Sequence, residues 1–228
     1  MRFATISTLR ATSQPALVIE DRVHTLPFAD MYAVMEVGAE KAAKKASKDW
    51  LPVDEVKFLS PLKPFTLRDG YAFEQHVLTA NRNRGRDVPA EWYEFPVFYF
   101  TNPNAVFGHE DVIPYPHYTD AMDYELEIAA VVGKGGMNIK PEDAPNHIFG
   151  YTIFNDWSAR DVQRKEMAVG LGPAKGKDFA SAFGPLIVTH EALADKWTGR
   201  PGVYDLEMSA KVNGKELSRG NFKDMHWS

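Results

Sequence analysis

The sequence predicts a mainly β fold with some helix, a mixed α/β architecture. Many short apolar segments are separated by turn residues, since the 228 residues include 16 Gly and 15 Pro. Residues 123–132 alternate between polar and apolar side chains, which is typical of a half-buried strand. No regular series of helices separates the short segments, so a parallel βαβ sheet is not expected. A chain of this length can bury roughly 70% of its surface, enough for a sizeable core.

The first sixty residues are predicted to form a small N-terminal domain. Residues 16–19 and 22–26 are expected to pair as a hairpin, because two apolar runs flank the polar pair Glu20 and Asp21. Residues 31–48 are rich in Ala, Glu and Lys and predict a helix with a solvated basic face. Two prolines in the next segment mark a linker, so the expected domains are residues 1–60 and 61–228.

The larger segment is expected to contain short strands joined by turns. Each run is apolar or aromatic and is bounded by Gly, Pro, Asn or Asp. The predicted strands are residues 97–100, 124–132, 151–154, 185–189 and 204–212.

Composition excludes several classes of protein. The 26 Lys and Arg against 31 Asp and Glu give a net charge of −5, which argues against nucleic-acid and anionic-membrane partners. The chain has no cysteine, so disulfides, thiolate metal sites and thiol nucleophiles are excluded. No apolar run approaches the roughly eighteen residues of a membrane-spanning helix, and the N-terminal residues do not resemble a signal peptide. We therefore expect a cytoplasmic protein.

Three acidic residues share one face of the strand predicted around residue 125. Asp123, Glu125 and Glu127 occupy alternate positions, so their neighbouring carboxylates are expected about 7 Å apart. At that distance two negative charges repel by roughly 0.6 to 2.4 kcal/mol. The face is therefore either solvated or compensated by a cation.

Two further acidic positions lie at element boundaries. Asp156 follows an apolar run, and Ser158 with Asp161 fits a capping box, which places Asp156 at a junction between a strand and a helix. Asp69 lies seven residues before His76. Taken alone, an aspartate in a turn and a single histidine are as consistent with structural roles as with functional ones.

Taken together, five segments in this order resemble the fumarylacetoacetate hydrolase family, including its bacterial fumarylacetoacetase and acylpyruvate hydrolase members. The resemblance covers roughly residues 60–228. The segments are residues 69–76, which contain Asp-Gly-Tyr and the histidine; 123–134, with Asp-Tyr-Glu-Leu-Glu; 149–163, with Asn-Asp-Trp-Ser-Ala-Arg-Asp-Val-Gln; 176–185, with Gly-Lys-Asp-Phe-Ala-Ser; and the Val-Asn-Gly of 212–214.

The resemblance implies a β-roll or sandwich catalytic domain that holds a divalent cation. The implied metal ligands are Asp69, Glu125, Glu127 and Asp156. Carboxylate ligands suit Mg²⁺ or Ca²⁺, with Mn²⁺ as a further possibility. Lys177 and Ser181 are implied near the metal, with Lys177 offsetting negative charge and contributing to catalysis, although read alone Lys177 fits a surface lysine.

The implied activity is hydrolysis of a carbon–carbon bond in a 1,3-diketo acid of the fumarylacetoacetate or acylpyruvate type. His76 would take a proton from water, and the metal would polarise the carbonyl that is attacked. Tyr71, Arg160 and Gln163 match substrate-binding positions. Arg160 is equally well explained as a partner in an internal salt bridge.

Two alternative functions remain open from the sequence. One is an oxo-acid decarboxylase or hydroxy-dienoate isomerase on the same metal site, and the other is a non-catalytic metal-bound protein that binds a ligand. The resemblance also implies a homodimer, for which the aromatic run at residues 95–100 offers apolar surface. Family members usually continue into another strand and a Gly-Thr turn, so we expect this chain to lack the family's C-terminal end.

Overall fold

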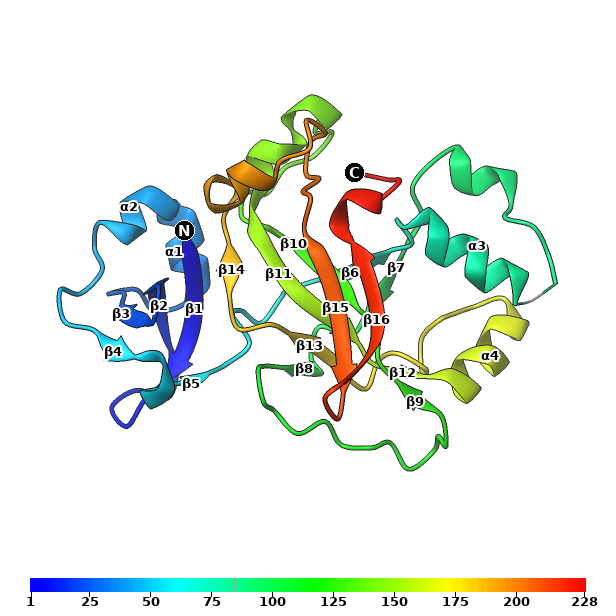
Figure 1. Cartoon of the computed structure of the whole chain (residues 1–228), viewed down its shortest axis with the longest axis horizontal. Helices are drawn as coiled ribbons and strands as arrows, with labels where there is room; N and C mark the ends of the chain where they lie inside the picture. The colour runs from blue at the N-terminus through cyan, green and yellow to red at the C-terminus, as the bar shows by residue number, and fades with distance from the viewer. Residues whose placement is uncertain (84) are drawn as a thin grey trace.

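A ten-stranded sheet runs through the structure, a computed structural model that describes residues 1–83 and 85–228 (Figure 1). Its strands are β1 (Arg2–Ser7), β2 (Gln14–Ile19), β3 (Arg22–Thr25), β4 (Leu51–Pro52), β5 (Lys57–Phe58), β8 (Val106–Phe107), β10 (Glu127–Val132), β11 (Ile148–Asp156), β13 (Ser181–Phe183) and β14 (Ile187–Val188). The strand order is β4-β3-β2-β1-β14-β11-β13-β8, with β10 beside β11 and β5 beside β1. The predicted mixed α/β class, dominated by strands, is confirmed.

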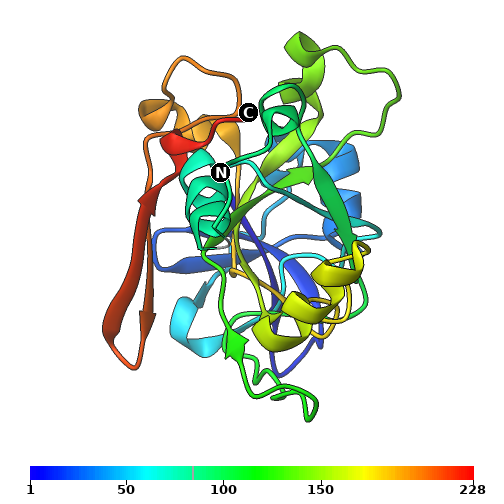
Figure 2. The same cartoon turned by 90° about the vertical axis from the view of Figure 1, so that its right-hand side faces the viewer.

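Three two-stranded sheets complete the β structure. One pairs β6 (Leu67–Gly70) with β7 (Phe98–Thr101), another pairs β9 (Met122–Asp123) with β12 (Ser158–Ala159), and the third pairs β15 (Glu207–Val212) with β16 (Lys215–Asn221). The β15–β16 hairpin lies along one side of the molecule in Figure 2. The β6–β7 pair carries Asp69, one of the acidic residues described below.

The helices are few and short. They are α1 (Met31–Val37), α2 (Ala39–Ala43), α3 (Glu74–Arg82) and α4 (Arg160–Val169), with 3-10 turns at Val53–Glu55, Ala90–Tyr93, Pro141–His147, His190–Lys196 and Phe222–Asp224. α1 and α2 lie at the end of the molecule that holds the N-terminal strands, and α3 and α4 lie at the other end (Figure 1). Among the residues described, no helix has the length and apolar character needed to cross a membrane. The cytoplasmic location stays a prediction.

The N-terminal hairpin forms as predicted, but the following helix does not. β2 and β3 pair with Val18 opposite Val23, and Glu20 takes a positive φ of 54° in the tight turn between them. The helix predicted over residues 31–48 is broken at Gly38, whose φ of 87° cannot continue a right-handed helix. The result is two short helices, of which α1 ends at Val37 and α2 ends at Ala43.

The N-terminal strands belong to the same sheet as the later strands. β1 pairs antiparallel with β14, with Phe3 opposite Ile187, and both side chains are fully buried in one core cluster. Val131 of β10 and Val34 of α1 belong to that cluster as well. The sheet and its core therefore continue across the boundary predicted near residue 60, while the division into two domains stays a prediction.

The strand predicted over residues 124–132 begins later than expected. Residues 124–126 lie between β9 and β10, and the backbone N–H groups of Tyr124 and Glu125 bond to side chains. The backbone N–H of Glu125 donates to Asn155 Oδ1 at 3.0 Å, and that of Tyr124 donates to Asp123 Oδ1 at 3.0 Å. The predicted strand at residues 204–212 likewise begins only at Glu207.

The capping box predicted at the start of α4 does not form. Ser158 lies in β12, and its hydroxyl donates to the backbone oxygen of Asp156 at 3.1 Å. The residue before α4 is Ala159, which provides no side-chain cap. Asp161 instead accepts from the Thr119 hydroxyl and from the N–H of Asp120 at 3.2 Å. Asp156 does end a strand shortly before a helix, as predicted.

Replacing Gly150 by Ala should destabilise the sheet where β11 meets β14. A Cβ there would lie 2.6 Å from the Val188 carbonyl oxygen and 2.8 Å from Ile187 Cγ2, both in the core of the sheet. Overpacking of this kind costs about 1–3 kcal/mol. Urea denaturation should show the loss, and Gly135→Ala, whose Cβ would enter open space, is the matched control. Equal midpoints for the two variants would contradict this account.

Candidate metal centre

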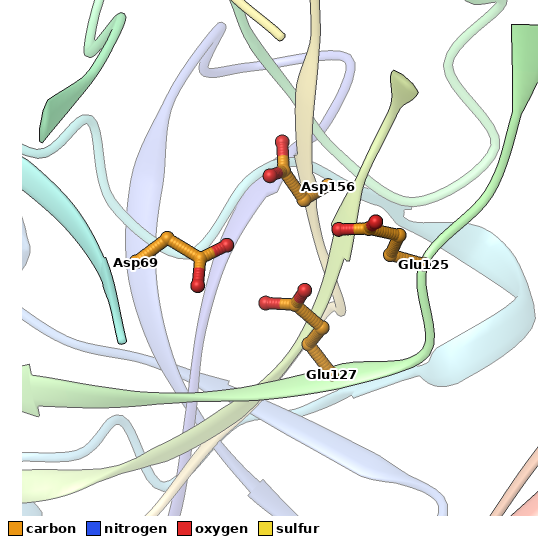
Figure 3. Close-up of side chains that lie close together, drawn as sticks. All are labelled: Asp69, Glu125, Glu127 and Asp156. Carbon is orange, nitrogen blue, oxygen red and sulfur yellow. The ribbon is translucent and has the colours of Figure 1, made fainter. Parts of the chain in front are cut away.

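Four acidic side chains from different segments point toward one another (Figure 3). One carboxylate oxygen from each lies within 4.8 Å of those of the other three. Asp69 lies on β6, Glu127 begins β10, Asp156 ends β11, and Glu125 precedes β10. We call these four residues the acidic cluster.

Strand pairing explains why the acidic cluster assembles. Glu127 lies opposite Phe154 in the β10–β11 pair, so Asp156 and Glu125 follow on the same face in opposite chain directions. The side chain of Asn155 holds the backbone of Glu125 in place beyond the end of β10. Asp69 arrives from the separate β6–β7 sheet. The sequence pattern predicted the shared face of the two glutamates but not the strand pairing that adds the aspartates.

Tyr99 joins the two aspartates of the acidic cluster and was missed by the sequence reasoning. It lies directly opposite Asp69 in the β6–β7 pair. Its hydroxyl lies 3.0 Å from Asp69 Oδ2 and also contacts Asp156 Oδ2. Burial, followed by the nearby charges of Asp69 and Asp156, raises the pKa of Tyr99 far above its ordinary value, so the phenol stays protonated. The sequence gives no signal for it, because residues 98–100 are all aromatic and only the structure shows that Phe98 and Phe100 are exposed while Tyr99 faces the cluster.

Lys177 is buried beside the acidic cluster. Its side chain is only 3% exposed, and its Nζ lies 2.8 Å from Asp156 Oδ2 and also pairs with Glu125 Oε2. Burial alone would lower the pKa of Lys177, but the charges of Glu125 and Asp156 outweigh it and raise the pKa above its ordinary value. The residue is therefore a fixed ammonium group, and its interpretation as a surface lysine is wrong.

Arg160 makes an internal network. Its Nε donates to Asp123 Oδ2 at 2.9 Å, and its Nη1 donates to Glu125 Oε1 at 2.6 Å. The same Nη1 lies 3.2 Å from Gln163 Oε1. Desolvation of the guanidinium opposes the charged form, but Glu125 and Asp123 raise the pKa of Arg160 overall. The structure thus shows the salt-bridge role of Arg160, and substrate binding by Arg160 and Gln163 stays a prediction.

Buried negative charge dominates the electrostatics of the acidic cluster. When ionised, the four carboxylates carry −4, and Lys177 and Arg160 carry +2; because Arg160 also pairs with Asp123, a net negative charge remains. Burial and the charge of Asp156 raise the pKa of Asp69 to about 7. Burial and the charge of Asp69 raise the pKa of Glu127 well above its usual range. Without a further cation, the cluster therefore retains protons near neutral pH.

Asp156 and Glu125 have opposite shifts for a clear physical reason. Burial raises the pKa of Asp156, and Lys177 offsets that effect only in part. For Glu125, burial acts in the same upward direction, but Lys177 and Arg160 together outweigh it and hold its pKa below the ordinary value. Glu125 is therefore the carboxylate of the cluster that stays charged most readily.

The residues of the acidic cluster fit a divalent cation. Asp156 Oδ1 is buried and has no hydrogen-bond partner among the residues that the structure describes. A buried carboxylate oxygen without a partner is costly, and a cation would satisfy it. The donors are carboxylate oxygens, which suit Mg²⁺, Ca²⁺ or Mn²⁺, and a dication would offset the remaining negative charge. The four residues are those that the resemblance implied as ligands.

Of the other candidate residues, Ser181 lies beside the cluster, and Tyr71 and His76 follow the strand that carries Asp69. His76 is exposed on α3, and its ring packs edge-on against Tyr71 with centroids 5.2 Å apart. Residues 71–73 connect β6, which carries Asp69, to the start of α3. Ser181 is buried on β13 directly opposite Asp156. These positions leave the roles of His76, Tyr71 and Ser181 as predictions.

Curated relatives support the resemblance. The chain is 31% identical to a fumarylacetoacetase from Oryza sativa subsp. japonica over 229 residues, covering 82% of this chain and 53% of that protein. It is 34% identical to the oxaloacetate tautomerase YisK of Bacillus subtilis over 180 residues, covering 77% of this chain and 55% of the relative. The chain thus spans about half the length of these relatives.

Solved structures share the fold over nearly the whole chain. A fumarylacetoacetate hydrolase from Exiguobacterium antarcticum matches with a TM-score of 0.73 and 25% identity, covering 99% of this chain and 76% of that one. A 5-carboxymethyl-2-hydroxymuconate delta-isomerase from Mycobacterium smegmatis matches with a TM-score of 0.70 and 24% identity, covering 96% and 75%. The family model described as "Fumarylacetoacetate (FAA) hydrolase C-terminal" matches residues 66–228. The chain therefore belongs to the fumarylacetoacetate hydrolase family.

Proposed function

We propose that this chain is a metal-dependent hydrolase that cleaves a carbon–carbon bond in a 1,3-diketo acid of the fumarylacetoacetate or acylpyruvate type. The observation that carries the proposal is the acidic cluster, in which one oxygen of Asp156 is buried with no hydrogen-bond partner among the described residues and the ammonium group of Lys177 lies beside the carboxylates. Family membership and the fumarylacetoacetase relative support this substrate class.

The reaction needs positive charge next to a carbonyl group. Cleavage of a 1,3-diketone releases a carbanion, which is a poor leaving group unless its charge is delocalised onto oxygen as an enolate. A divalent cation held by Asp69, Glu125, Glu127 and Asp156 would polarise the substrate carbonyl and stabilise that enolate. Lys177 adds a second positive charge that does not depend on pH in the working range, because its pKa is raised.

The remaining steps are proton transfer and substrate binding by side chains of the chain. His76 is exposed on α3 where water reaches it, and it takes the proton from the attacking water as the general base. Tyr99 holds its proton and keeps Asp69 and Asp156 in position. Arg160, Gln163 and Tyr71 orient the acid end of the substrate, with Arg160 already fixed by Asp123 and Glu125.

The second candidate function is tautomerisation of an oxo-acid. It is favoured by the oxaloacetate tautomerase of B. subtilis, which is 34% identical over 180 residues. Tautomerisation passes through the same kind of enolate but breaks no carbon–carbon bond and needs no activated water. A decarboxylase or a hydroxy-dienoate isomerase would use the enolate in a related way.

Variants at His76 and Glu127 should differ in kind. His76→Ala should keep metal affinity and lower the turnover of an acylpyruvate by roughly 10² to 10⁴, which is the usual contribution of a positioned general base. Glu127→Ala should lose metal binding and turnover together, because it removes a charge and a ligand position from a hard-cation site. Calorimetric titration with Mg²⁺ or Mn²⁺ and steady-state kinetics measure the two effects.

The same assays decide between hydrolase and tautomerase. The parent chain and the two variants should each be assayed with an acylpyruvate and, separately, with the enol form of oxaloacetate. Ultraviolet absorbance and NMR follow the products. Acid products released from the acylpyruvate support the hydrolase. Conversion of enol to keto oxaloacetate with no cleavage of the acylpyruvate would contradict the hydrolase proposal and support the tautomerase. Full activity of His76→Ala would contradict the proposal that His76 is the general base.

Metal binding should compete with protons. The pKa of Asp69 is about 7 in the folded metal-free chain and ordinary in the unfolded chain, so the folded state binds an extra proton between about pH 4 and 7. The metal-free protein therefore loses stability as pH rises through this window, by at most about 4 kcal/mol from this group. Mg²⁺ affinity should rise over the same window.

Thermal unfolding in EDTA and in Mg²⁺ at pH 5 and pH 8 tests this competition. We expect Mg²⁺ to raise the Tm strongly at pH 8 and weakly at pH 5. Asp69→Asn is the matched control, because the variant cannot exchange a proton at this position, so its metal-free Tm should depend less on pH. A Tm gain from Mg²⁺ that is equal at both pH values would contradict the prediction.

We also propose that the chain forms a homodimer through the outer face of β7. Phe98 and Phe100 are 58% and 63% exposed, and both rings pack against the Arg68 guanidinium and against each other. Sedimentation at micromolar concentration should give a dimer for the parent and a monomer for Phe98→Glu combined with Phe100→Glu. Leu9→Glu, at another exposed apolar position, should leave the dimer intact. A monomeric parent would contradict the proposal.

A further inference from the structure

Glu166 binds three successive backbone N–H groups of the loop that carries Lys177. Its Oε1 accepts from Ala174 at 2.7 Å and from Gly176 at 3.0 Å, and its Oε2 accepts from Lys175 at 2.8 Å. Successive N–H groups that converge in this way form a typical site for an anion. Here the anion is a side chain of α4, the helix that precedes the loop.

A second observation shows that the loop is seated closely on α4. Gly176 is buried, and a Cβ at this position would lie 2.9 Å from Gln163 Cβ and 3.0 Å from Gln163 Cα and N. The carbonyl of Gly176 also accepts from the Ala159 N–H at 2.7 Å, immediately before α4. The backbone next to Lys177 is therefore fixed to the helix from two sides.

The same helix thus helps to position both positively charged side chains that pair with the acidic cluster, Arg160 and Lys177. Arg160, in the first turn of α4, reaches Glu125 directly at 2.6 Å. Lys177 is eleven residues beyond Glu166 in the sequence, at the end of an irregular segment, yet it is almost fully buried and lies 2.8 Å from Asp156. A long side chain on an irregular segment needs its backbone held to keep that position.

We propose that Glu166 is a positioning residue for Lys177: its carboxylate fixes residues 174–176 against α4 and so holds the ammonium group between Glu125 and Asp156. The inference rests on the proposed function for its catalytic consequence, but the position of Lys177 can be tested without metal or substrate. The Glu166 carboxylate bonds to the backbone of residues 174–176 and acts on the acidic cluster only through Lys177.

The test is the reactivity of Lys177 toward an amine-directed acetylating reagent, measured by peptide mass spectrometry on the metal-free protein. Lys177 should be protected in the parent because it is 2% exposed, while Lys44 serves as an exposed internal reference. In Glu166→Gln the loop loses its anion, and labelling of Lys177 should rise at least about tenfold relative to Lys44. Lys165→Ala, at the neighbouring exposed position, should leave the labelling unchanged.

A second variant keeps the test decisive if Glu166→Gln does not fold. Glu166→Asp retains the charge but is one methylene shorter, so it should hold the loop partly and give intermediate labelling of Lys177. Unchanged labelling in the variants that fold would overturn the positioning role. A drop in the Tm with no rise in Lys177 labelling would mark Glu166 as a structural residue only, and would likewise overturn it.

Kinetics separate this inference from the proposed function. If both hold, Glu166→Gln should lower the turnover of the diketo acid about tenfold to a hundredfold, as expected for a displaced catalytic group, and Lys165→Ala should not. If labelling of Lys177 rises while turnover stays at the parent value, Glu166 still positions Lys177, and the catalytic role of Lys177 is what fails.

Discussion

Repulsion among four closely spaced carboxylates is the constraint on which the rest of this structure depends. Two strand pairs bring the acidic cluster together, and each of its members is stable only because charge or protons compensate it. Lys177 and Arg160 supply part of that compensation and are themselves charged because of it. The positively charged side chains and the carboxylates therefore stabilise one another's charged forms. The strands and the helix that carry them must be held in one relative position for this to happen.

The sequence predicted the parts of the acidic cluster more reliably than the elements around them. Period-two alternation placed Glu125 and Glu127 on one face, although residues 124–126 leave the strand to bond with side chains. The capping box predicted at Ser158 does not form, because the Ser158 hydroxyl donates to the backbone oxygen of Asp156 instead. The prediction of one helix over residues 31–48 is wrong, because composition does not reveal where a glycine will take a positive φ.

Long-range pairing explains what the sequence could not show. Tyr99 becomes part of the site only because β7 lies beside β6, thirty residues away in the chain, with Tyr99 opposite Asp69. Lys177 reads as a surface lysine because its burial depends on a loop held against α4. Local patterns record which face a side chain occupies, whereas these positions depend on which strands and helices become neighbours.

The pairing of β1 with β14 has a consequence for how the chain folds. Phe3 lies opposite Ile187, and the N-terminal ammonium group of Met1 donates to Thr189 Oγ1 at 2.7 Å. On that side β5 pairs with Ile6 and Ser7, but Arg2 and Phe3 obtain their neighbour only after most of the chain has left the ribosome. Until then the start of β1 presents an open strand edge. A topology with contacts this distant in sequence folds slowly. During synthesis, that strand edge is the surface that we expect chaperones to bind.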